Sequence, residues 1–186
     1  EFGVDYVEAG FPSSNPKERE LFNALEREEM RGTKVAAFGM TRRRGTSADA
    51  DEALRDLAAS FVPVATIVGK TWGLHLEKVI KVDRAENLRM IEDSVAFLVA
   101  QGKEVVYDAE HFFDAYRAHP DYAIDCLKAA ASGGATWVTP CDTNGGTLPN
   151  EMTRIIAAVR AALPDVQLGI HTHNDGECGV ANTLAA

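Results

Sequence analysis

The chain has 186 residues, 46% of them hydrophobic, which is enough for one globular domain with a substantial core. Its 19 Lys and Arg against 28 Asp and Glu give a formal net charge of −9, which argues against a nucleic-acid-binding protein. No apolar run approaches the roughly 18 residues of a membrane span, and no signal-peptide pattern is present. The cysteines Cys126, Cys141 and Cys178 form no CxxC pair, which argues against a disulfide framework or a zinc ribbon. We therefore expect a soluble cytoplasmic protein.

Short β-branched segments alternate with longer helical segments along the chain. Strands are expected at residues 4–9, 34–38, 62–68, 103–107, 137–140 and 167–171. Helices are expected at residues 16–31, 48–59, 84–101, 122–132 and 150–162. Asn15 and Pro149 are suitable helix starts, and Gly32 and Gly102 are suitable helix stops.

Two of the helical segments have a clear apolar face, because their apolar residues recur three or four positions apart. These residues are Leu88, Ile91, Val95, Leu98 and Val99 in the first segment and Met152, Ile155, Ile156, Val159 and Leu163 in the second. The chain begins at Glu1 close to a strand and stops at Ala186 within a helix-like segment. Such ends leave backbone groups unpaired, so we expect a part of a larger protein.

The strand segments are continuously apolar, as strands covered by helices require, so the sheet should be parallel. Six strands at this spacing fit an open doubly wound sheet or most of a (β/α)₈ TIM barrel. Only Gly10 follows the first strand closely, where a dinucleotide-binding turn needs three glycines. The polar residues at the strand ends favour an incomplete TIM barrel.

Polar residues follow every expected strand, at the end where the active site of a parallel barrel lies. Carboxylates, imidazoles and a threonine stand at these positions, whereas ordinary loop polarity comes from Lys, Ser and Gly. The segments are Glu8; residues 41–45 with three arginines; residues 70–75; residues 108–111; residues 142–146; and residues 171–175.

His171 and His173 are two residues apart on a strand, so both imidazoles should face the barrel mouth. Two imidazoles near carboxylates form half of a divalent-metal site suited to Mg²⁺, Mn²⁺ or Zn²⁺ acting as a Lewis acid. Glu8 and Asp142 are candidates for a third ligand or for substrate binding. The alternative is a pair of structural histidines joined to the fold by hydrogen bonds.

The other candidate residues have weaker signals. The Thr143 hydroxyl beside a glycine loop can hold a carboxylate, although the segment also fits a simple turn. Glu110 is a candidate general base, and His75 either donates to an oxyanion or caps a helix. The arginines at 42–44 could meet a phosphorylated cofactor, but a solvated basic loop is the favoured interpretation. Nothing near Cys141 marks an activating base for a nucleophile.

Together these segments resemble the metal-dependent acyltransferase family of α-isopropylmalate, homocitrate and citramalate synthases. The resemblance depends on residues 8–12 with 15–18, on Asp142-Thr143-Asn144-Gly145, and on His171-Thr172-His173-Asn174-Asp175. Residues 38–43, 107–114 and 141–149 are similar to the bacterial citramalate synthase branch. The match runs from the second barrel strand to the helix after the seventh. The family's first-strand Arg-Asp-Gly and eighth-strand Gly-x-Gly-Glu-Arg motifs are absent from these residues, so residues 1–186 would form a partial catalytic domain without the first and eighth βα units.

The resemblance implies that His171 and His173 bind the metal and that Thr143 holds the carboxylate of a 2-oxo acid. It places Glu110 near the acetyl group as base or base partner and His75 near the substrate. The implied reaction condenses acetyl-CoA with a 2-oxo acid, and pyruvate would give citramalate and CoA for branched-chain amino acid biosynthesis. We also expect a homodimer.

Three other interpretations stay open. An isopropylmalate or homocitrate synthase would take another 2-oxo acid, and a relative of 3-hydroxy-3-methylglutaryl-CoA lyase would run the reverse cleavage. A barrel whose histidines serve only structure or metal storage would not be an enzyme. Thiol release from acetyl-CoA with and without pyruvate separates the synthase from the lyase, and a screen of pyruvate, 2-oxoisovalerate and 2-oxoglutarate separates the synthases. Binding of Mg²⁺ or Mn²⁺ without any 2-oxo-acid-dependent release of CoA would favour the barrel that is not an enzyme.

Overall fold

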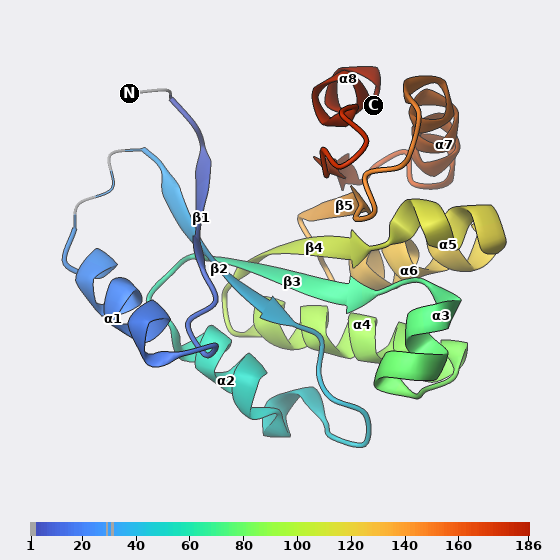
Figure 1. Ribbon diagram of the computed structural model, residues 1–186. Coiled ribbons are helices and arrows are strands. Elements are labelled where there is room, and N and C mark those ends of the chain that lie inside the picture. The colour runs from blue at the N-terminus through green and yellow to red at the C-terminus, as the bar shows by residue number, and fades with distance from the viewer. Residues whose placement is uncertain (1–2, 29, 31) are drawn as a thin grey trace.

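A computed structural model describes residues 3–28, 30 and 32–186 (Figure 1). A seven-stranded sheet forms its centre, and every strand pairing in it is parallel. The strand order is β1-β2-β3-β4-β5-β6, and β7 pairs with β5 beyond β6. The strands are β1 (Tyr6–Gly10), β2 (Lys34–Met40), β3 (Val64–Lys70), β4 (Glu104–Glu110), β5 (Trp137–Asp142), β6 (Gln167–Leu168) and β7 (His171–Thr172). The predicted parallel α/β sheet is confirmed.

Helices connect successive strands and cover one face of the sheet, with α1, α2 and α4 on the same side in Figure 1. The helical elements are α1 (Pro16–Leu25), the 3₁₀ turn η1 (Ala48–Ala50), α2 (Glu52–Ala59), α3 (Gly73–His75), the π-helical turn η2 (Leu76–Ile80), α4 (Arg84–Ala100), α5 (Phe112–Ala118), α6 (Pro120–Ser132), α7 (Pro149–Ala162) and α8 (Gly179–Ala185). Among the helices that the structure describes, none has the length and apolar character needed to cross a membrane.

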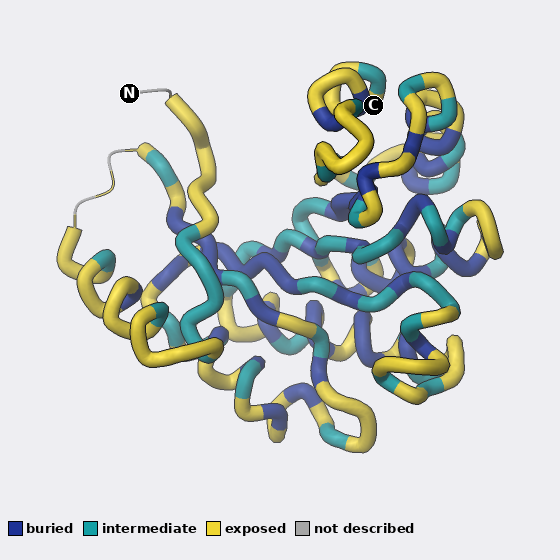
Figure 2. Tube along the Cα trace, viewed as in Figure 1, coloured by how far each residue is buried: buried dark blue, intermediate teal, exposed yellow. Residues whose placement is uncertain are grey.

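The core lies between the helices and the sheet, and Figure 2 shows the buried strands at the centre of the molecule. The apolar face predicted for α7 is confirmed, since all five of its residues are buried. On α4 the prediction holds for Ile91, Val95 and Leu98, but it was wrong for Val99, which is exposed, and it missed the buried Met90. Asn15 caps α1 by accepting from the backbone N–H groups of Lys17 and Glu18, as expected.

Several predicted boundaries were wrong. The helix predicted for residues 16–31 ends at Leu25, so Gly32 does not stop it. Gly32 instead lies just before β2, with a φ of +81°. Arg31, the predicted last residue of the helix, lies outside the described residues. The strand predicted for residues 167–171 is two short strands. Gly169 stands between them, where an added Cβ would come 2.7 Å from Oγ1 of Thr139. The helices α3 and α5 were missed because each is too short to show a period.

Replacing Gly69 by alanine is expected to lower the free energy of unfolding by about 1–3 kcal/mol. Gly69 lies on β3, where an added Cβ would stand 2.4 Å from Oη of Tyr107 and 2.7 Å from its Cε2. Tyr107 is fully buried, so its ring cannot move aside without disturbing the core. Urea denaturation measures the change, and Gly73→Ala is the control because no atom lies within 4 Å of a Cβ there. Equal stability of Gly69→Ala and the original protein would contradict this packing.

Candidate active site

The face of the sheet opposite the helices carries the polar residues. On β4, Val105, Tyr107 and Ala109 are fully buried towards the helices, whereas the residues between them are half-buried on the other face. This alternation follows from the two-residue period of a strand. Side chains from β1 to β5 and from β7 line a hollow of about 570 Å³ on this open face, and they include Glu8, Asp108 and His171.

His171 and His173 lie side by side at the end of β7. Their ring centroids are 5.0 Å apart and their planes differ by 18°, so the imidazoles are stacked. The prediction that both rings project to the same side is confirmed. Their side chains are 52% and 41% exposed, which leaves ring nitrogens accessible to a ligand.

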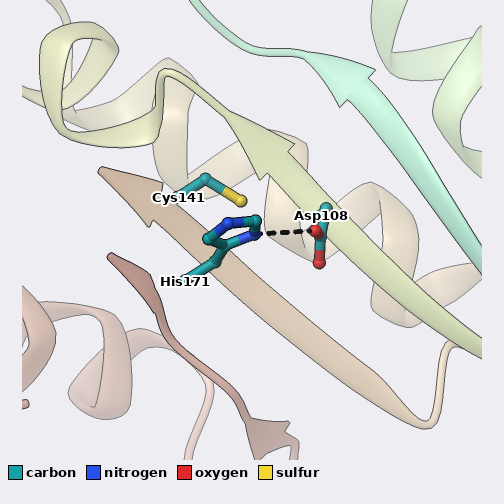
Figure 3. A group of neighbouring side chains, drawn as sticks. All are labelled: Asp108, Cys141 and His171. Carbon is teal, nitrogen blue, oxygen red and sulfur yellow. Dashed lines mark hydrogen bonds and ion pairs between the residues drawn. The ribbon is translucent and has the colours of Figure 1, made fainter. Parts of the chain in front are cut away.

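Asp108 and Cys141 lie next to His171, as Figure 3 shows. The three residues come from β4, β5 and β7, and the ligand atoms that they offer lie within 4.8 Å of one another. His171 Nδ1 is 3.4 Å from Oδ2 of Asp108, and this hydrogen bond raises the pKa of His171. Burial raises the pKa of the Cys141 thiol well above its ordinary value. The Asp108 carboxylate and the His171 imidazole in this arrangement can bind a divalent metal, whereas the Cys141 thiol would first have to lose its proton.

Glu8 reaches the same hollow from β1. Desolvation is the main cause that raises the pKa of its carboxyl, a hydrogen bond with Thr66 opposes the rise, and the nearby Asp108 adds to it. Glu8 and Asp108 are therefore two carboxyl groups sharing one side of the site with His171.

The ends of β3 and β4 hold the second group of site residues. Lys70 and Glu110 are register partners and form an ion pair. His75 Nδ1 lies 3.9 Å from Oε2 of Glu110 and has no hydrogen-bond partner in the described part of the chain. Burial lowers the pKa of His75, and the charge of His111 acts in the same direction, so the imidazole is neutral at pH 7.

His75 is also held by aromatic contacts. Its ring centroid lies 4.5 Å from that of His111, and Trp72 lies 5.5 Å from both imidazoles. His111 itself is fixed by Asp114, whose Oδ2 is 3.1 Å from His111 Nδ1. His111 and Trp72 were not predicted as site residues from the sequence, where they stand within the polar segments 108–111 and 70–75. His111 stands immediately before the short helix α5, and no periodic pattern marks a helix of that length.

The loop after β5 links Thr143 to this group. The backbone N–H of His111 donates to Oγ1 of Thr143 over 2.8 Å, so Thr143 lies beside the end of β4. Asp142 is 1% exposed and its carboxylate accepts from the backbone and hydroxyl of Thr147. Contrary to our expectation of a metal or substrate contact, Asp142 braces this loop, because both of its oxygens are already engaged inside the protein.

The arginines after β2 divide into two kinds. Arg42 is buried and pairs with Glu86 and Asp93, so the expectation of a solvated loop was wrong for this residue. Arg43 and Arg44 are exposed, as expected.

The two-residue repeat of a strand could have marked Asp108 as a site residue from the sequence alone, since Asp108 lies two residues before Glu110 on the same strand.

Comparisons with known proteins identify the relatives of this chain. A family model described as HMGL-like matches residues 1–186. The chain is 48% identical to an (R)-citramalate synthase of Geobacter sulfurreducens and 44% identical to one of Aquifex aeolicus, over 186 residues in each case. It is 35% identical to a probable 2-isopropylmalate synthase of Methanopyrus kandleri. The chain covers 35% of each of these relatives, so it spans about a third of their length.

Solved structures show the same fold. An HMG-CoA lyase of Bacillus subtilis superposes with a TM-score of 0.78 at 17% identity, over 98% of this chain and 61% of the lyase chain. The carboxyl transferase domain of Rhizobium etli pyruvate carboxylase, solved with pyruvate, superposes with a TM-score of 0.68 at 16% identity, over 98% of this chain and 31% of that chain. At these identities the likeness establishes the barrel fold, of which this chain forms a part.

Proposed function

The chain belongs to the HMGL-like family, and we propose that it carries the catalytic site of a citramalate synthase, which condenses acetyl-CoA with pyruvate to citramalate and CoA. The stacked pair of His171 and His173 beside Asp108 is the observation that carries this proposal. The relatives support the choice of reaction, since five (R)-citramalate synthases match at 42–48% identity and three 2-isopropylmalate synthases at 31–35%.

The donor set at the end of β7 fits a divalent metal. His171 and His173 supply two nitrogens on one side, and Asp108 is close enough to orient the ring of His171 or to join the ligands. Glu8 adds a second carboxyl group in the same hollow. When bound there, Mg²⁺, Mn²⁺ or Zn²⁺ would supply Lewis-acid polarisation of the ketone of the 2-oxo acid.

The residues at the ends of β3, β4 and β5 would handle the substrates. Thr143 lies beside the end of β4 and would hold the carboxylate of the 2-oxo acid. Glu110 would take the proton from the acetyl methyl group, with the ion pair to Lys70 holding its carboxylate in place. The neutral His75 has a ring nitrogen without a partner beside Glu110, and it would donate a hydrogen bond to the oxygen that gains charge during condensation.

The proposal extends to the whole protein. Because the chain covers 61% of the lyase chain that it resembles, we assign residues 1–186 to part of a TIM-barrel catalytic domain whose first and eighth βα units lie elsewhere in the full-length protein. A homodimer acting in the cytoplasm, in the branched-chain amino acid pathway to isoleucine, belongs to the same proposal.

A choice among 2-oxo acids tests the function. The full-length protein is expected to release CoA from acetyl-CoA with the highest kcat/KM when pyruvate is added, compared with 2-oxoisovalerate and 2-oxoglutarate. One methylene in a pocket changes the transition-state energy by about 1–3 kcal/mol, and 2-oxoisovalerate is two carbons larger than pyruvate, so the preference should be at least roughly tenfold. A preference for 2-oxoisovalerate would make the protein an isopropylmalate synthase, and release of CoA without any 2-oxo acid would refute the condensation.

A further inference from the structure

The loop that follows β2 has no role in the chemistry described above, although it lies at the same end of the sheet as Glu110. Its residues 41–46 include Arg42, Arg43 and Arg44. Together with Lys70 they line a hollow of about 410 Å³, and Lys70 also forms the ion pair with Glu110. One cavity therefore runs from the residue next to the proposed base to a group of arginines.

Arg42 anchors this loop from inside the protein. Its side chain is 7% exposed, and its guanidinium pairs with Glu86 over 2.9 Å and with Asp93 over 2.8 Å. Arg42 also donates through Nη1 to the carbonyl of Thr46, and its backbone N–H donates to Ser94. These contacts fix both ends of the loop against α4, so the backbone that carries Arg43 and Arg44 is held in place.

Arg43 and Arg44 point outward from the anchored loop. Arg43 is 69% exposed, and only its Nε and backbone N–H donate to Asp51. Arg44 donates through Nη1 to the backbone carbonyl of Lys81 and is itself exposed. The charge of Arg42 is offset by its two acidic partners, whereas Arg43 uses only Nε of its guanidinium for Asp51, so the remaining donors of Arg43 and of Arg44 are the ones that face a ligand. In a chain with a net charge of −9, an anionic ligand needs such a local cluster to bind.

We propose that this cluster binds the phosphates of the acyl-thioester co-substrate, that is, the phosphorylated adenosine end of acetyl-CoA. The inference builds on the proposed function. β3 separates β2 from β4, so the arginines lie about 10 Å from Glu110 across the sheet, or two strand spacings. Acetyl-CoA has a matching separation between its reacting end and its charged end, because an uncharged pantetheine arm lies between the acetyl group and the phosphates. Guanidinium groups suit phosphates because they donate two parallel hydrogen bonds to one phosphate.

The experiment compares two thioesters in the full-length protein. Acetyl-CoA carries the phosphates and S-acetylpantetheine lacks them, but both present the same acetyl group. For the double variant Arg43→Ala with Arg44→Ala, kcat/KM with acetyl-CoA should fall about tenfold or more, because each lost bond is charge-assisted, while kcat/KM with S-acetylpantetheine should stay within about twofold. Arg154→Ala is the control, since Arg154 is 65% exposed on α7, and it should change neither value.

Binding measured by calorimetry adds a result that does not depend on turnover. CoA should bind to the wild-type protein, and the double variant should bind it about tenfold more weakly or worse. An equal effect on both thioesters, or unchanged binding of CoA, would overturn the phosphate site. Loss of CoA binding in the double variant, with no turnover of either thioester by the wild-type protein, would support the phosphate site and refute the proposed function.

Discussion

Replacing His173 by alanine is expected to lower metal-dependent turnover at least about a hundredfold, since even the partners of metal ligands contribute about 10- to 100-fold to metal affinity or activity. The ring of His173 stacks on that of His171 and is the second nitrogen donor on the open face of the sheet. Release of CoA in the presence of pyruvate and Mn²⁺ measures the loss. The fold should stay intact because the His173 side chain is 41% exposed, so its removal leaves no buried cavity.

His119 provides the matched control for this variant. It is exposed, and its side chain makes no capping hydrogen bond to the helix that it precedes. His119→Ala should therefore turn over as the original protein does. If His173→Ala kept full activity at all metal concentrations, His173 would not be a ligand.

Replacing Glu110 by glutamine should lower kcat by about 10²- to 10⁴-fold and change KM little, as expected when a general base is removed. Glutamine keeps the size of the side chain and removes the carboxylate that would take the proton. Steady-state rates with acetyl-CoA and pyruvate measure this effect. Binding of the substrates should persist, because Thr143 and the histidine pair are untouched.

A second ion pair on the same strand provides a control that distinguishes the loss of a general base from the loss of a salt bridge. Glu104 lies on β4 and pairs with Lys34 over 2.6 Å, as Glu110 pairs with Lys70. The two glutamate side chains are similarly exposed, at 19% and 23%. Glu104→Gln should keep kcat within about twofold, since a partly exposed pair contributes little to the structure. Equal loss in both variants would show that Glu110 acts through the fold and not as a base.

The sequence predicts those features of the fold that depend on a regular spacing of apolar or polar residues along the chain. Continuous apolar strands predict the parallel sheet, and the two-residue repeat predicts that His171 and His173 share one side, which the stacked rings confirm. The helix starts at Asn15 and Pro149 are predictable because capping is local chemistry.

Contacts between distant segments could not be predicted in the same way. Asp142 and Thr143 are adjacent in the chain, yet Asp142 turns inward to Thr147 and Thr143 turns to His111, and nothing in the local pattern separates them. Arg42 resembles its neighbours in sequence but pairs with Glu86 and Asp93 on α4, more than forty residues later. Cys141 meets Asp108 and His171 only because β5 lies between β4 and β7.

Titration with Mn²⁺ measures the central claim most directly, because the electron paramagnetic resonance signal of free Mn²⁺ reports binding without any need for turnover. The full-length protein should bind one Mn²⁺ ion, and the single variants His171→Ala and His173→Ala should each bind it at least about tenfold more weakly, while His119→Ala binds it normally. Equal affinity in all four proteins would mean that the paired imidazoles hold no metal, and the proposed site would be wrong.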